Sequence, residues 1–85
     1  MAIAFDFSEV SQHVKAVLRH EFGPDVSIRT DEGWQGRVHV KIVSSAFGSR
    51  NEDEKQTMVW EVLRRELKAE SQAVSLVLAY GTDEI

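Results

Sequence analysis

Residues 37–67, RVHVKIVSSAFGSRNEDEKQTMVWEVLRREL, hold the clearest structural pattern in this chain of 85 residues. Apolar residues alternate with polar ones at Val38, Val40 and Ile42, which predicts a strand with one buried face. A short polar connection follows, and the acidic run 52–54 then favours the positive end of a helix dipole. The stretch therefore predicts a strand, a loop and a helix in that order.

The helix in this stretch has two candidate starts and one apolar side. Ser49 with Glu52 fits a capping box. Asn51 with Glu54 fits one equally well. The buried side is predicted from residues at three- and four-residue spacings, with Trp60 at its margin: Met58, Val59, Val62, Leu63 and Leu67. We expect this helix to fray near Glu70.

An amphipathic helix is also predicted earlier in the chain. Asp6 and Glu9 fit a capping box at its start, and Gly23-Pro24 predicts its end. Its apolar stripe has the same spacings: Val10, Val14, Val17, Leu18 and Phe22. His13 and His20 lie beside the stripe, seven residues apart, whereas metal-binding histidines on one helix usually have four-residue spacing. We therefore interpret both as surface histidines.

Two further strands complete the predicted elements. Residues 26–30 alternate in polarity, and the glycine-containing loop 31–36 joins them to the next strand as a hairpin. Trp34 in that loop could be a recognition residue, but we expect it to fold back over the sheet edge. Residues 73–80 are apolar on both faces, which predicts a central or well-covered strand.

The predicted order is therefore helix, strand, strand, helix, strand. The first two strands should pair antiparallel, and the helical connection to the third should form a right-handed crossover to a parallel neighbour. We expect an α+β fold, a two-layer α-β-β-α-β sandwich with a three-stranded mixed sheet and the helices on one face. A chain of this length supports one domain, over residues 1–85.

Composition limits the function classes. The chain is 42% hydrophobic and 28% charged, with no apolar run long enough for a membrane span and no signal-peptide pattern at its start. It has no cysteine, so disulfides, thiol catalysis and cysteine-ligated metals are excluded for this chain alone, and a cytoplasmic location is expected. The net charge of −4 argues against strong nonspecific binding to nucleic acid.

Several segments match one family. Residues 43–47 fit a Val-Ser-x-x-Phe motif, with a basic residue three positions later at Arg50. The following helix and strand contain further matches: Met58, Val59, Trp60 and Leu63, then residues 72–76. On these residues the chain resembles the BolA-like family. The resemblance implies a class II KH-like fold with a short helical turn before the long helix, and a regulatory role linked to the stress response.

The chain departs from the family at its best-known site. BolA-like proteins carry an Arg-His-Arg triplet whose histidine is associated with a [2Fe–2S] cluster shared with a monothiol glutaredoxin. Here the triplet is Lys55-Gln56-Thr57, and an amide is a poor ligand for iron in a thiolate-rich site. The loop 31–36 also lacks the family's second ligand, a cysteine or histidine. We therefore expect no bound cluster, cofactor or metal, although the resemblance still implies a monothiol glutaredoxin as partner.

A non-enzymatic regulator or adaptor is the expected function. Its protein contacts are predicted at a surface made of Phe47, Arg50, Lys55 and Gln56. No nucleophile–base pair or metal-ligand cluster is recognisable in the sequence, and so small a core encloses no ordinary pocket, so an enzyme is not expected.

A KH-like nucleic-acid-binding regulator is the alternative. Arg50, Lys55, Arg64 and Arg65 would form a modest basic surface for DNA. Residues 48–51 lie near the connection that carries the Gly-x-x-Gly loop of KH domains, but they lack the second glycine. The oligomeric state has no signal in the sequence.

Overall fold

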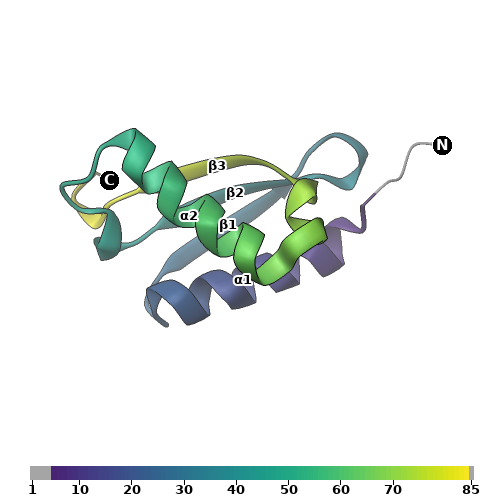
Figure 1. Cartoon of the computed structure of the whole chain (residues 1–85), viewed down its shortest axis with the longest axis horizontal. Helices are drawn as coiled ribbons and strands as arrows, with labels where there is room; N and C mark the ends of the chain where they lie inside the picture. The colour runs from purple at the N-terminus through teal and green to yellow at the C-terminus, as the bar shows by residue number, and fades with distance from the viewer. Residues whose placement is uncertain (1–4, 85) are drawn as a thin grey trace.

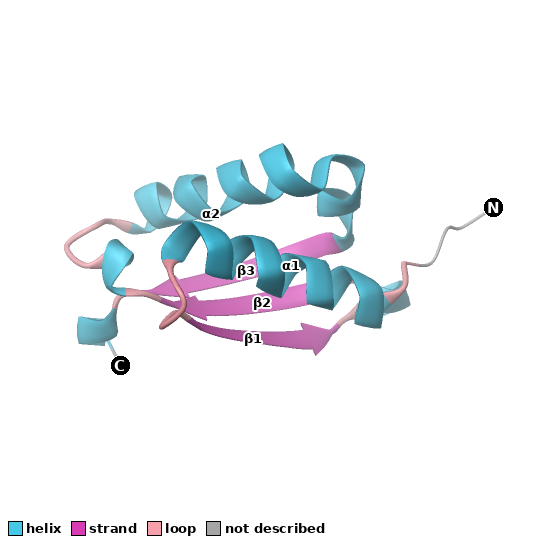
Figure 2. Cartoon of the chain, turned by 90° about the horizontal axis from the view of Figure 1, so that it is seen from below, coloured by secondary structure: helices cyan, strands magenta, loops and turns pink. Residues whose placement is uncertain are grey.

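A computed structural model describes residues 5–84, which form one three-stranded sheet covered by two long helices (Figure 1). The helices are α1, Phe7–Phe22, and α2, Glu52–Leu67. The strands are β1, Ser27–Glu32, β2, Val38–Val43, and β3, Val74–Tyr80. Both helices pack on the same side of the sheet (Figure 2). The predicted α+β fold with a three-stranded mixed sheet is confirmed.

The sheet has the strand order β1-β2-β3. β1 and β2 are antiparallel, as predicted, and β3 runs parallel to β2. The register shifts by one residue at the start of β3, where Val38 faces Val74 and His39 faces Leu76. The prediction of a central last strand is wrong, because β2 lies between the other two strands and β3 is an edge strand.

The core lies between the sheet and the helices. Alternate residues of β2 point into it, so the pattern at Val38, Val40 and Ile42 is confirmed as a buried face. Helix residues complete this layer: Val10, Val14, Leu18, Val59, Val62 and Leu63. Apolar side chains at three- and four-residue spacings therefore build the covered side of the sheet.

The ends of α1 follow the predicted signals in part. The Asp6 carboxylate accepts a hydrogen bond from the Glu9 backbone N–H (3.2 Å), but the Glu9 side chain does not return the bond that would complete a capping box. Gly23 ends the helix with φ 103°, a conformation that glycine adopts without strain.

The ends of α2 decide between the two predicted starts. Asn51 is the N-cap, and it exchanges both capping-box bonds with Glu54 (2.9 and 3.1 Å). The helix does not fray near Glu70 as expected. It ends at Leu67, Lys68 adopts φ 54°, and a 3-10 helix, η3 (Lys68–Ala73), leads directly into β3.

Three other 3-10 turns join the elements, and they are η1 (Trp34–Gly36), η2 (Ser45–Phe47) and η4 (Thr82–Glu84). The turn η2 occupies the position where the BolA-like resemblance implies a short helical turn. Among residues 5–84, neither α1 nor α2 has the length and apolar character that crossing a bilayer requires.

The hairpin between β1 and β2 is held against the start of the chain. Gly36 has φ 78°, and a Cβ there would overlap the carbonyl oxygen of Phe5. The Phe5 N–H donates to the Gln35 carbonyl oxygen (3.2 Å), and the Arg37 guanidinium lies 5.6 Å from the centre of the Phe5 ring. Only glycine permits this close approach of the two backbones.

Candidate functional site

Phe47 was predicted as a contact residue, but it belongs to the core. Its side chain is fully buried, and its ring packs 5.2 Å from the Phe22 ring, centre to centre. The turn η2 points the ring inward because the Ser44 side chain accepts a hydrogen bond from the Ala46 N–H (3.1 Å) and fixes the turn. A partner cannot reach Phe47 in this structure.

Lys55 is also buried, with only 4% of its side chain exposed. Its ammonium group forms a short ion pair with Glu84, and the Glu52 carboxylate lies 4.0 Å away. The hydrogen bond from Lys55 lowers the pKa of Glu84, assisted by the Gly81 N–H, which donates to the same carboxylate (2.6 Å). That bond to Glu84 likewise raises the pKa of Lys55 against the opposing effect of burial. Lys55 therefore joins α2 to η4 and offers no free charge to a partner.

Gln56 connects α2 to the edge of the sheet. Its amide Nε2 donates to the Val77 carbonyl oxygen (2.8 Å), and its Oε1 accepts from the Trp60 indole N–H (3.1 Å). The Tyr80 carbonyl accepts from the Ser44 N–H of the neighbouring segment, so alternation along β3 directs the Val77 carbonyl to the free edge. Gln56 thus caps an edge acceptor that no neighbouring strand satisfies.

The residues at this position do not fit an iron–sulfur cluster. Both polar ends of the Gln56 amide are bonded to protein groups. The hairpin loop contains neither thiol nor imidazole, and amides are poor ligands in soft sites. These contacts give Gln56 a structural role at the position where the BolA-like resemblance would place a histidine.

The arginines of the predicted surface have internal partners. The Arg50 Nε–H donates to the Ala46 carbonyl (3.1 Å), and its guanidinium lies 3.7 Å from the Glu54 carboxylate. Arg64 stacks 5.5 Å from the centre of the Trp60 ring. These contacts hold both side chains against their own helix and loop.

Arg65 pairs with two carboxylates. It contacts Glu21 of α1 at 2.7 Å and Glu66 at 2.9 Å, and these hydrogen bonds raise the guanidinium pKa further above its already high value. Two carboxylates therefore compensate the charge of Arg65. The six predicted site residues share α2 and the turn before it, but they do not form one accessible surface.

The opposite side of the sheet presents a different set of side chains. We call it the bare face, and it comprises three cross-strand rows: Ser27, Val43 and Tyr80; Arg29, Lys41 and Leu78; and Asp31, His39 and Leu76. Leu76 and Leu78 are 43% and 40% exposed, because no described element covers this side of β3. The Lys41 ammonium lies 5.6 Å from the centre of the Tyr80 ring.

Among residues 5–84, the most exposed large apolar side chain lies at the hairpin tip beside this sheet. Trp34 is 79% exposed, so the expectation that it folds back over the sheet edge is wrong. The turn η1 holds the loop in this conformation, with Gln35 at φ 55° and Gly36 against the backbone of Phe5. The recognition-residue alternative for Trp34 is the one that this exposure favours.

Comparison with known proteins adds no relative, since no family model, curated protein or solved structure matches this chain. The BolA-like resemblance therefore stands on the quoted residues alone.

Sequence reasoning missed the bare face although a signal was present. Residues 73–80 are apolar at nearly every position, which fits either a strand covered on both sides or an edge strand with exposed apolar residues. Two helices are enough to cover only one side of a three-stranded sheet. Counting the available helices would have favoured exposure of Leu76 and Leu78.

Proposed function

We propose that this chain is a non-enzymatic adaptor that binds another protein through the bare face. The observation that carries the proposal is the exposure of Leu76 and Leu78, two residues apart on the uncovered side of β3. Exposed apolar side chains that gather on one surface, rather than being scattered, are typical of interaction sites. This location differs from the surface around Phe47 that the resemblance suggested.

The charges beside the leucines indicate the chemistry of the partner. Lys41 lies in the same cross-strand row as Leu78, and its ammonium group makes no ion pair with a carboxylate of residues 5–84. Arg29 completes the row and makes only a long contact of 3.8 Å with Asp31. A partner that presents apolar side chains flanked by carboxylates would complement this row.

The hollows formed by residues 5–84 open to solvent, which supports a non-enzymatic function. A hollow of ≈ 440 Å³ lies along α2, and its lining residues come from that helix: Gln56, Thr57, Trp60, Glu61 and Arg64. With no second element opposite, such a hollow does not enclose a substrate in the way that catalytic pockets do.

The nucleic-acid alternative loses its main support. It depended on four basic residues, of which Lys55 is buried and Arg65 is paired with two carboxylates. The exposed acidic run 52–54 lies beside Arg50, where a phosphate would approach. We therefore retain the adaptor as the single proposal.

A monothiol glutaredoxin is the first partner to test, because the BolA-like resemblance implies it. The experiment is a titration of isotopically labelled protein with a cluster-free monothiol glutaredoxin, followed by nuclear magnetic resonance. We expect saturable shifts at Lys41, Leu76 and Leu78, and at least about tenfold weaker binding for the double substitution Leu76→Ser and Leu78→Ser. The matched control is Arg64→Ala, on α2, which should bind as the natural sequence does.

Two results would contradict parts of this proposal. Absence of any shift would exclude the glutaredoxin as partner. Shifts confined to Arg50 and Gln56, with no effect of the leucine substitutions, would return the contact to the surface first predicted from the sequence and would overturn the bare face as the docking site.

A further inference from the structure

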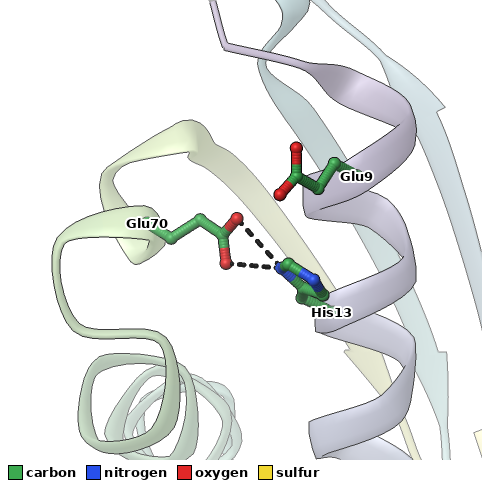
Figure 3. A group of neighbouring side chains, drawn as sticks. All are labelled: Glu9, His13 and Glu70. Carbon is green, nitrogen blue, oxygen red and sulfur yellow. Dashed lines mark hydrogen bonds and ion pairs between the residues drawn. The ribbon is translucent and has the colours of Figure 1, made fainter.

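Three potential metal ligands converge where α1 meets η3 (Figure 3). Glu9 and His13 are four residues apart on α1, so they share one side of the helix. Glu70 reaches them from η3, the turn that follows α2. One ligand atom of each residue lies within 4.8 Å of the other two.

The contact between His13 and Glu70 does not explain the presence of Glu9. The His13 Nδ1 lies 2.9 and 3.0 Å from the two Glu70 carboxylate oxygens. A ring nitrogen carries at most one proton, so this contact already uses the only donor that Nδ1 has. Within residues 5–84 the Glu9 carboxylate accepts no hydrogen bond and forms no ion pair. Two carboxylates thus face one nitrogen, and a cation placed among them would compensate both.

The dimensions fit a small transition-metal ion. Zinc lies about 2.0–2.2 Å from nitrogen and oxygen ligands, so tetrahedral geometry separates neighbouring ligand atoms by about 3.4 Å. The pair of His13 and Glu70 at 2.9 Å needs only to open by a few tenths of an ångström to admit an ion, by the same geometry. Glu9 is exposed, so rotation of its side chain can close the remaining gap without moving the backbone.

The backbones that carry the ligands are fixed by other contacts. Val10 and Val14 are buried beside Glu9 and His13, which sets the rotation of α1 against the core. In η3, the buried Ser71 donates from its hydroxyl to the Lys68 carbonyl (2.6 Å), which holds the turn that presents Glu70. The three ligands therefore project from ordered elements, as a metal site requires.

We propose that Glu9, His13 and Glu70 form a binding site for Zn²⁺, with water as the fourth ligand. Imidazole together with carboxylates suits zinc, whereas Mg²⁺ prefers oxygen ligands and retains its waters. The ion would link the first turns of α1 to the segment that leads into β3. This site is separate from the bare face, so the zinc proposal does not depend on the adaptor function.

Calorimetric titration of the chain with ZnCl₂ tests the site, and we expect one Zn²⁺ per chain. Thermal unfolding at a free zinc concentration of about 100 times Kd should show a rise in Tm on the order of 10 °C. Glu9→Gln keeps the shape of the side chain and, since the Glu9 carboxylate bonds to none of residues 5–84, should fold normally. Loss of a residue that only supports a ligand lowers metal affinity by about 10-fold to 100-fold. Because Glu9 is proposed as a ligand itself, Glu9→Gln should lower the zinc affinity by more than this. His13→Ala should abolish binding.

Controls distinguish this site from weak surface binding. His20→Ala removes another exposed histidine of the same helix and should leave the zinc affinity unchanged. MgCl₂ at the same concentration should give no rise in Tm. Zinc binding that persists in both Glu9→Gln and His13→Ala, that falls equally in His20→Ala, or that is absent in the natural sequence would overturn the proposal.

Discussion

On the covered face of the sheet, Val40 and Ile42 are at most 1% exposed, whereas Leu76 and Leu78 on the bare face are 43% and 40% exposed. Burial of Val40 and Ile42 removes apolar area from water, so their contribution to stability is enough to explain these residues. Leu76 and Leu78 keep a large part of their surface in water, so their burial contributes less to stability. Residues that folding does not explain are the better candidates for function, and in this protein they lie on the side of the sheet that the helices leave open.

The largest expected effect is the difference between Phe47 and Trp34. The sequence predicted Phe47 on a contact surface and a Trp34 that covers the sheet edge, whereas Phe47 is buried and Trp34 is exposed. Phe47→Ala should lower the free energy of unfolding by about 3–5 kcal/mol, because it leaves a cavity in the core beside Phe22. Trp34→Ala should change it by less than about 0.5 kcal/mol, because the indole is exposed. Urea denaturation measures both values. Equal losses would contradict the distinction between core and surface drawn here.

The edge cap provided by Gln56 should have an intermediate effect. Gln56→Ala removes the donor to the Val77 carbonyl and the acceptor for Trp60, which should cost about 1–3 kcal/mol of unfolding free energy. Gln12→Ala, at an exposed position of α1, is the matched control and should be close to neutral. If Gln56→Ala proved neutral too, water would be replacing both hydrogen bonds, and Gln56 would no longer be explained by the fold.

A smaller effect that depends on pH is expected at Glu84, whose carboxylate is partly exposed and screened by solvent. The pKa of Glu84 is lowered from 4.5 in the folded state, mainly by Lys55. Its contribution to stability is therefore complete above pH 4.5 and is lost as the pH falls from there through the lowered value. Glu84→Gln should be less stable at pH 7, and the difference should shrink in unfolding curves recorded below about pH 4.

The smallest effect on stability is expected on the bare face. Leu78→Ser should change the free energy of unfolding by less than about 1 kcal/mol, since the side chain is already 40% exposed. The same substitution should weaken partner binding, so stability and binding separate at this residue. Val77→Ser, at the neighbouring buried position, is the contrasting control and should destabilise clearly. A strong loss of stability in Leu78→Ser would show that the bare face serves folding.

Local patterns were sufficient for most of the fold. The alternation at Val38, Val40 and Ile42 predicted β2, and the capping pattern at Asn51 was one of two predicted starts of α2. These features depend on residues a few positions apart, whose geometry the backbone fixes. The order of elements then constrained the pairing of the strands.

Non-local partners explain what could not be predicted. Lys55 resembled a surface cation until its partner was known, and Glu84 lies 29 residues further on in a segment that had no recognisable pattern. His13 meets Glu70 across 57 residues of sequence, so the cluster with Glu9 has no sequence motif either. No spacing rule connects residues that meet only after the sheet has formed.

The parallel pairing of β2 with β3 also indicates the order in which the strands join during folding. The antiparallel hairpin of β1 and β2 closes over a short loop. In contrast, the segment between β2 and β3 includes α2 and η3, so their pairing closes a much longer loop. Contacts between distant segments form slowly, because a long loop must close before they are made. The strand that bears the exposed leucines should thus be the last to join the sheet and the first to leave it. A protein bound across the bare face would slow the departure of β3, and its amide protons would then exchange with solvent more slowly than those of the unbound chain.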